Sequence, residues 1–327
     1  MAPSSSATLP AECRLARGEP AQARRLYERA LADAVARPRV ALPVTGDLHV
    51  GLAGVLIEQD ELDAAGVHLA TARELGDAAS LPENRFRWYA VMAGLRRAEG
   101  DFDSAVEMLD EAAARYLPGF FPELQPLPAA IARVRIAQGR LAEAAEWARK
   151  RGVTAADPPS YAAEFDQLTL ARLLVAGGDH RDALALLERI VDAAETAGRT
   201  GSVVEARLLR GLAREAAGDA DAATADVTAA FDAGRPAGYV RLFLEAGPTA
   251  ARLFRAGESA RPPESDLSER ELEVLRMLAS DLTGPEIARH LFVSVNTLRT
   301  HTKHVFTKLE VTTRRGAVQR AAERGLL

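Results

Sequence analysis

Cysteine is nearly missing from this sequence: Cys13 is the single one, so the chain can form no internal disulfide and has no thiolate pair for a zinc site. Long apolar runs are missing too, since none approaches the roughly 18 residues that span a bilayer. The first residues, MAPSSSATLP, lack the basic and apolar segments of a signal peptide. We therefore expect a cytoplasmic protein without membrane contact, in which residues 1–10 are disordered.

Lysine is also scarce, with three residues in the whole chain, Lys150, Lys303 and Lys308. No Gly-x-x-x-x-Gly-Lys-Ser/Thr sequence occurs, so the chain has no loop of the kind that cradles nucleotide phosphates. The six histidines include no His-Glu-x-x-His pair, and His301 and His304 have no nearby cysteine or acidic ligand to complete a metal site. These absences predict a protein that is not an enzyme and holds no cofactor and no metal.

Charge is distributed unevenly along the chain. The net charge of −5 argues against general affinity for nucleic acid. From Leu267 onward, however, the sequence has ten Lys and Arg and seven Asp and Glu. This part therefore has a net charge of +3, and the preceding part has a net charge of −8. Any affinity for DNA is therefore confined to the C-terminal end.

Helix caps are the clearest feature of that end. Ser268 with Glu271 forms a capping box for a helix over 269–280. The same reasoning gives two further helices, one opened by Thr283 with Glu286 and one over 295–309 opened by Ser294. The pattern is a helix, a short turn and a second helix.

The third helix, 295–309, has two different faces. Residues three, four and seven apart share a face, so one side is apolar and packs inward: Leu298, Val305 and Leu309. The other side is polar, with two cations and no carboxylate: Asn296, Arg299, Thr300, Lys303 and Thr307. Such a face is usually plain solvated surface, but the caps and the turn beside it favour contact with phosphates and base edges of DNA.

The whole C-terminal segment resembles the DNA-binding domain of the LuxR family of bacterial transcription regulators. The family pattern is matched at Glu271–Leu275, Glu286–Ala288, Ser294–His301 and Lys308–Val311. The resemblance implies that Arg299, Thr300 and Lys303 contact bases in the major groove of double-stranded DNA, and that Ser294, Thr297 and Lys308 contact phosphates. It further implies a homodimer on DNA, formed by a fourth helix with Arg314, Ala317, Val318 and Ala321.

The match to this family has three departures. Gly284 and Pro285 stand where Asn-Lys is frequent, so one phosphate-seeking cation is missing. Arg299 replaces the commoner lysine, and its planar guanidinium favours guanine. Glu310 stands where glycine is usual, which costs on the order of 1 kcal/mol if that position needs a positive φ.

The preceding region, residues 11–254, shows an internal repeat with helical periodicity. Equivalent turn positions are Gly18, Gln59, Gly100, Gly139, Gly178 and Gly218, with separations of 41, 41, 39, 39 and 40 residues. Five residues after each comes an alanine: Ala23, Ala64, Ala105, Ala144, Ala183 and Ala223. We interpret this as about six helical hairpins that stack into a tetratricopeptide-like superhelix with a concave binding surface. Residues 255–266, rich in proline, are expected to form an extended linker to the domain at 267–327.

Three segments of the repeats resemble the sensor region of the large, ATP-binding, MalT-like LuxR regulators: Glu164–Gly178, Ala197–Ala213 and Gly238–Pro248. The resemblance implies an inducer or protein partner on the repeats, and it favours activation, hence RNA polymerase as a partner. Trp88, Tyr161 and Phe165 are the candidates for a sensor pocket. Because no ATP site is present, the chain is either a short regulator or the C-terminal part of a longer one.

The sequence as a whole predicts an all-α protein, with a tetratricopeptide-like superhelix followed by a LuxR-type four-helix helix-turn-helix domain. We interpret it as a transcription regulator that reads a pseudo-palindromic operator through the helix at 295–309. The alternative is a repeat scaffold that sequesters another regulator and binds DNA weakly or without specificity.

Overall fold

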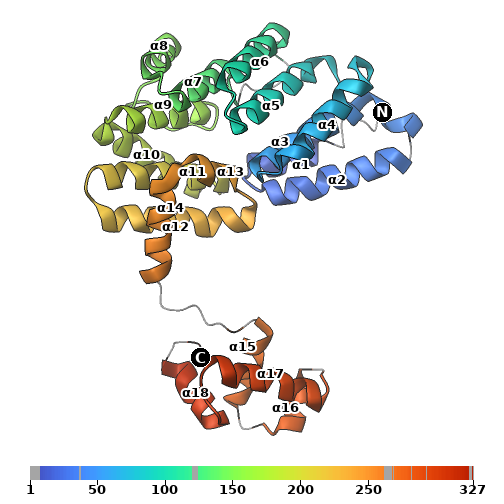
Figure 1. The fold of residues 1–327 in the computed structure, drawn as a ribbon, viewed down its shortest axis with the longest axis vertical. Helices are drawn as coiled ribbons and strands as arrows, with labels where there is room; N and C mark the ends of the chain where they lie inside the picture. The colour runs from blue at the N-terminus through green and yellow to red at the C-terminus, as the bar shows by residue number, and fades with distance from the viewer. Residues whose placement is uncertain are drawn as a thin grey trace. The chain divides into compact units, whose positions relative to one another are not determined.

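The computed structural model describes residues 8–36, 38–119, 124–260, 267, 269–280, 282–291, 293–323 and 326. All regular secondary structure in these residues is helical, which confirms the all-α prediction. The chain forms two compact units, divided between Glu258 and Ser259, and each is described by itself (Figure 1).

The first unit is built from antiparallel helix pairs. Its α-helices are α1 (Leu9–Ala16), α2 (Pro20–Ala36), α3 (Pro38–Glu58), α4 (Leu62–Leu75), α5 (Arg85–Ala98), α6 (Phe102–Arg115), α7 (Leu127–Ala137), α8 (Leu141–Arg151), α9 (Glu164–Gly177), α10 (His180–Thr196), α11 (Thr200–Ala216), α12 (Ala220–Ala237), α13 (Arg241–Glu245) and α14 (Gly247–Ala260). Two short 3₁₀ turns, Asp77–Ala79 and Pro82–Asn84, lie between α4 and α5.

Each hairpin turns through a residue with a left-handed backbone. Five of the six predicted turn positions are glycines with φ between +73° and +88°: Gly18, Gly100, Gly139, Gly178 and Gly218. Glycine adopts this conformation without the steric cost that other residues meet. The alanine five residues after each of these glycines is fully buried, which lets the two helices of a hairpin approach closely.

The second turn differs from the prediction by one residue. The left-handed residue is Asp60, with φ +62°, and the buried alanine is Ala65, whereas Ala64 is only partly buried. Asp60 and Ala65 keep the same five-residue offset as the other copies, so the separations on either side of this turn are 42 and 40 residues. Gln59 and Ala64 are therefore not the equivalent positions.

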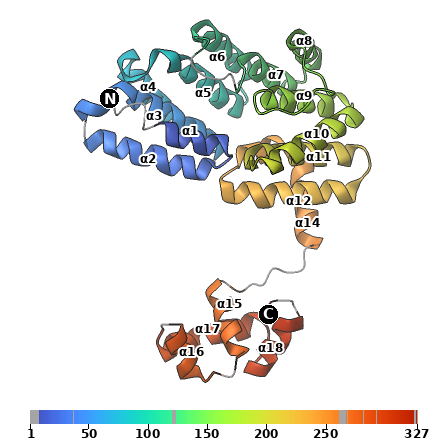
Figure 2. The same ribbon diagram turned by 180° about the vertical axis from the view of Figure 1, so that it is seen from behind.

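The ends of the first unit meet. Helix α12 contacts α2, and α13 contacts α3, although these elements are far apart in the sequence. In Figures 1 and 2, which view the molecule from opposite sides, the ends of α2 and α12 lie next to each other. The stacked hairpins thus form a ring within this unit.

Two predicted boundaries need correction. Helix α1 begins at Leu9, so Leu9 and Pro10 are helical; residues 1–7 lie outside the described residues. Helix α14 continues to Ala260, because no proline interrupts it before Pro262 and its residues Ala250 and Leu253 are buried in the unit. Residues 255–260 are therefore not an extended linker, and 261–266 lie outside the described residues.

No helix among the described residues is long and apolar enough to cross a membrane. The same residues contain no group of three or more His, Cys, Asp or Glu side chains placed to hold a metal ion.

Candidate nucleic-acid interface

The described residues from 267 onward form four short helices around one apolar core. They are α15 (Glu269–Leu278), α16 (Gly284–His290), α17 (Val295–Lys308) and α18 (Arg314–Glu323). Apolar side chains from all four helices are buried together: Val274, Leu275, Leu278, Ile287, Ala288, Leu298, Val305, Leu309, Ala317 and Ala321. This core fixes the angle between α16 and α17 and leaves the opposite face of α17 in solvent.

The caps of α16 and α17 follow the sequence prediction. Thr283 and Glu286 form the reciprocal capping box, in which the Thr283 backbone N–H donates to Glu286 Oε2 at 2.8 Å. These hydrogen bonds from Thr283 lower the pKa of the Glu286 carboxyl. Ser294 Oγ accepts from the Thr297 backbone N–H at 3.1 Å and so caps α17. The predicted cap of the first helix involves Ser268, which lies outside the described residues.

The outward face of α17 carries the three residues predicted to contact bases. Arg299, Thr300 and Lys303 are all exposed. Within the part of the chain that the structure describes, neither cation has an ion-pair partner. The Thr300 hydroxyl donates to the Asn296 carbonyl at 3.1 Å, so its remaining lone pairs are available as acceptors. This face can therefore offer two free cations and a hydroxyl acceptor to a groove.

Of the predicted phosphate contacts, Ser294 and Thr297 lie together at the exposed N-terminus of α17, with their hydroxyl oxygens 2.8 Å apart. Lys308 has a different environment. Its Nζ donates to Glu271 Oε2 at 2.7 Å, and the Glu271 side chain is only 6% exposed. His304 Nδ1 lies 3.8 Å from the other Glu271 oxygen. Lys308 thus neutralises a buried carboxylate, a contact that motif matching alone does not indicate.

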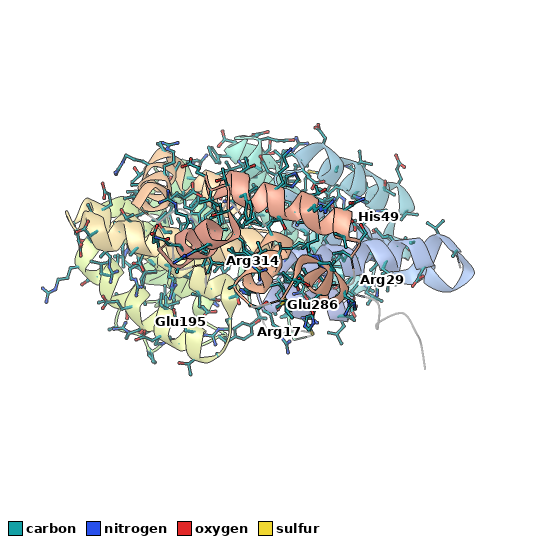
Figure 3. All side chains as sticks on the ribbon, turned by 90° about the horizontal axis from the view of Figure 1, so that it is seen from below. Arg17, Arg29, His49, Glu195, Glu286 and Arg314 are labelled. Atoms are coloured by element: carbon teal, nitrogen blue, oxygen red, sulfur yellow. The ribbon has the colours of Figure 1, made fainter. Side chains whose placement is uncertain are left out.

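The residues predicted for a dimer contact are mostly turned inward. Ala317 and Ala321 are fully buried in the unit's own core, so they cannot also touch a second chain. The Arg314 guanidinium donates to the carbonyls of Leu278 and Leu282, at 2.8 and 2.7 Å, and to that of Ser280. Arg314 therefore holds the turn after α15 in place. Val318 is only partly exposed. Figure 3 labels Arg314 on α18 and Glu286 on α16.

The turn after α17 has the conformation that glycine favours. Glu310 has φ +56°, one of two positive values found among the described non-glycine residues. A side chain in this region costs roughly 1 kcal/mol relative to glycine. Glu310, which departs from the LuxR pattern, therefore has a strained backbone conformation.

Two family models match the chain. Residues 6–260 match the model described as MalT-like TPR region, and residues 265–321 match the model described as bacterial regulatory proteins, luxR family. The chain belongs to the MalT-like TPR family. Its second unit is a luxR-family domain.

Curated relatives align with the luxR-family domain. The transcriptional regulatory protein LiaR of Bacillus subtilis is 42% identical over 69 residues, which are 21% of this chain and 32% of LiaR. The putative HTH-type transcriptional regulator Mb0914c of Mycobacterium bovis is 39% identical over 71 residues, 21% of this chain and 8% of that protein. The chain thus covers about a third of LiaR and less than a tenth of the mycobacterial protein. Among solved structures, the apo form of RapI aligns over 98% of this chain and 97% of its own, with 11% identity and a TM-score of 0.45.

The three candidates for a sensor pocket in the MalT-like repeats do not come together. Trp88 packs against the core of α1–α5, and its indole N–H donates to the Leu69 carbonyl at 2.9 Å. Phe165 packs instead against the core of α7–α11, and Tyr161 is 43% exposed. The prediction was wrong in grouping Trp88 with the other two, because a single sequence does not show which hairpins are neighbours.

A charged cluster around Phe165 was missed altogether. The Arg133 guanidinium lies over the Phe165 ring, 3.9 Å from its centroid, and Arg133 and Arg172 both contact the Glu205 carboxylate, at 3.1 and 2.8 Å. Burial opposes ionisation of Glu205, but the two arginines outweigh it and lower its pKa to about 2. Burial lowers the pKa of Arg133 to about 10. These residues come from α7, α9 and α11, so no local motif could reveal them.

Proposed function

We propose that this chain is a DNA-binding transcription regulator that inserts α17 into the major groove of its operator. One observation carries the proposal: Arg299 and Lys303 project from the solvent face of a capped helix, without ion-pair partners among the described residues. A helix of this kind fits the major groove, where guanine presents two acceptors to an arginine. The luxR-family match and the likeness to LiaR support the same function.

The proposed division of labour within the interface follows from the contacts of each side chain. Arg299, Thr300 and Lys303 read base edges, and Arg299 favours a guanine. Ser294 and Thr297, at the N-terminus of α17, bind phosphate, where the backbone N–H groups and the helix dipole favour an anion. Lys308 contributes to the stability of the domain through Glu271 rather than to phosphate binding.

We infer that the chain binds a pseudo-palindromic operator as a homodimer. A dimer contact through α18 must use its outward side, where Arg315 and Gln319 are exposed, and Val318 at its edge. Arg314, Ala317 and Ala321 would then support that helix from within. Two half-sites are expected about one helical turn apart, or a multiple of it.

The MalT-like repeats are proposed to bind an inducer or a protein partner. In this proposal the regulator acts in the cytoplasm, and it activates transcription through RNA polymerase. The repeats bring Arg133, Arg172 and Glu205 together from three hairpins, and this charged cluster suits a polar effector.

Selection of duplexes from a random library by the full chain tests the proposal. The wild type should enrich a pair of inverted half-sites, and Arg299→Ala should lose discrimination at one base pair per half-site by roughly 5- to 150-fold, the equivalent of about 1–3 kcal/mol. Arg276→Ala is the control, because Arg276 is also an exposed arginine without an ion-pair partner among the described residues, but lies on α15. No enrichment by the wild type would contradict specific DNA binding.

One observation favours a second candidate, the scaffold that sequesters another regulator. Gly284 and Pro285 place no cation at the N-terminus of α16, and Gly284 has no described atom within 4 Å of where a Cβ would lie. Fewer phosphate contacts weaken non-specific binding. A scaffold would retard all duplexes weakly and equally, and the Arg299→Ala change would have no effect.

A further inference from the structure

The two ends of the repeat unit touch through a small contact that we call the seam. In the seam, residues 18–21, 58–60 and 97–98 meet residues 201 and 238–245. The Val240 backbone N–H donates to the Glu58 carbonyl at 3.2 Å, and the Leu242 backbone N–H donates to Glu58 Oε1 at 3.0 Å. Arg241 bridges to Asp60 at 2.9 Å and donates to the Ala98 carbonyl at 2.7 Å.

Glycine backbones lie against each other at the seam. A Cβ added to Gly18 would lie 2.0 Å from the Gly201 nitrogen, and a Cβ added to Gly201 would lie 3.1 Å from the Gly18 Cα. A Cβ on Gly238 would lie 2.9 Å from Ala21. Closure of the ring therefore requires glycine at position 18 and leaves little room for a side chain at position 201.

Gly18 differs from its counterparts in the other hairpins. Gly100, Gly139, Gly178 and Gly218 occupy the same turn position with the same left-handed backbone, yet they are exposed and have no described atom within 4 Å of a Cβ. Gly18 is buried, because the last hairpins cover it. All five turns therefore favour glycine for its left-handed backbone, whereas the seam favours glycine only at position 18, where there is no space for a side chain.

The seam joins the ends of the ring without sharing a hydrophobic core. The apolar cluster of the first hairpins runs from Ala11 to Leu95, and that of the last from Val204 to Leu253. No described cluster contains buried residues from both. Besides the packed glycine backbones, the contacts across the seam are hydrogen bonds and partly exposed ion pairs, which contribute little net stability because water replaces them on opening. The ends can therefore separate while each core stays intact.

We propose that the seam is a clasp: the repeat unit rests as a closed ring, and separation of its ends is the conformational change that admits an effector to the inner surface. The purpose given to this motion rests on the sensor role proposed above, but the motion itself can be measured without DNA or effector. Each end of a stacked-hairpin array normally needs a polar cap. Here the two ends cap each other.

Distances between two spin labels on the full chain test the clasp. Cys13, the native exposed cysteine on α1, takes one label, and an Arg235→Cys change on exposed α12 takes the other. The parent pair should give one narrow, short distance. Gly18→Ala should shift most molecules to longer and broader distances, because the new methyl group cannot fit against Gly201.

Two further variants make the result decisive. Gly218→Ala is the matched control: it has φ +88° against +79° for Gly18, so it carries the same backbone strain without the clash, and it should keep the short distance. Gly201→Ala lies within α11 and carries no such strain; its methyl group would lie 3.1 Å from the Gly18 Cα, so it should open the ring in a smaller fraction of molecules than Gly18→Ala.

The proposal is overturned if Gly18→Ala keeps the parent distance, or if Gly218→Ala lengthens it as much as Gly18→Ala does. It is also overturned if the parent pair already gives the long, broad distribution. None of these results bears on DNA binding, so failure of the clasp and failure of the proposed function are distinguishable.

Discussion

At the scale of single residues, the second unit uses its cations in two ways. Lys303 and Arg299 are exposed without ion-pair partners in the described part of the chain, whereas Lys308 is bound to the buried Glu271 carboxylate. Both lysines lie on α17, and the resemblance to the LuxR family implies a DNA contact for both. Their contacts, not their place in the pattern, indicate what each contributes.

This difference predicts opposite effects for two lysine substitutions. Lys303→Ala should lower discrimination between operator and non-operator duplexes by about 1–3 kcal/mol and leave stability within about 0.5 kcal/mol. Lys308→Ala should lower the free energy of unfolding by about 1–2 kcal/mol, since the buried Glu271 carboxylate loses one ion pair while Lys308 itself is 38% exposed. Its salt slope should stay close to that of the wild type.

Salt-dependent binding titrations with operator and non-operator duplexes and urea unfolding of the two variants measure these effects. A reduced salt slope for Lys308→Ala with unchanged stability would show that Lys308 binds phosphate after all, as the family pattern implies.

At the scale of helices, caps and turns decide where each element ends. The sequence predicted α15, α16 and α17 to within about two residues, because capping boxes and N-caps are local hydrogen bonds between residues three apart. The one-residue shift at Asp60 was missed, since Ala64 and Ala65 adjoin and only burial tells which one packs between the helices.

Other features of the elements lie beyond a single sequence. Ala317 and Ala321 form an apolar stripe on α18, and such a stripe fits a domain core and a dimer contact equally well until its neighbours are known. The seam depends on contacts between residues 181 and 184 positions apart, such as Arg241 with Asp60 and Leu242 with Glu58. No local pattern encodes a pairing at that distance.

The strained end of α17 gives a prediction at this scale. Glu310→Gly should raise the free energy of unfolding by about 0.5–1 kcal/mol, because glycine accepts φ +56° without steric cost, partly offset by the greater freedom of glycine in the unfolded chain. Glu310→Ala keeps the strain and removes the charge, so it serves as the control. Thermal unfolding compares the three chains, and equal gains in both variants would assign the effect to charge rather than to backbone conformation.

At the scale of the whole molecule, the seam and the recognition helix each belong to one unit and can be examined separately. Glu58 makes the seam sensitive to pH, since burial raises the pKa of its carboxyl to about 7. The Leu242 and Val240 backbone N–H groups and Arg97 act against this rise, and Glu245 adds to it. Tyr239 faces the same carboxyl, and its own pKa is raised by burial and by Glu58.

The sign of the pH effect follows from this raised pKa. In the open ring, Glu58 is expected to titrate near its ordinary value of 4.5, so the closed ring holds the proton more tightly. The contribution of Glu58 to the stability of the closed ring is therefore fully present below about pH 4.5. It is lost as the pH rises to about 7. The label pair on residues 13 and 235 should show a larger long-distance fraction at pH 8 than at pH 5.

Glu58→Gln should remove most of this pH dependence, because an amide oxygen still accepts from Leu242 but does not ionise. An equal dependence in Glu58→Gln would assign the titration to another group of the seam.

The most direct test of the account is to map where DNA contacts the chain, by backbone amide chemical shifts of the full protein titrated with its selected operator. We predict that the largest changes fall on α17, from Ser294 through Lys303, with smaller changes at the start of α16. Changes confined to the repeat unit or to α18, with the amides around Arg299 and Lys303 unmoved, would contradict the claim that this helix reads the groove.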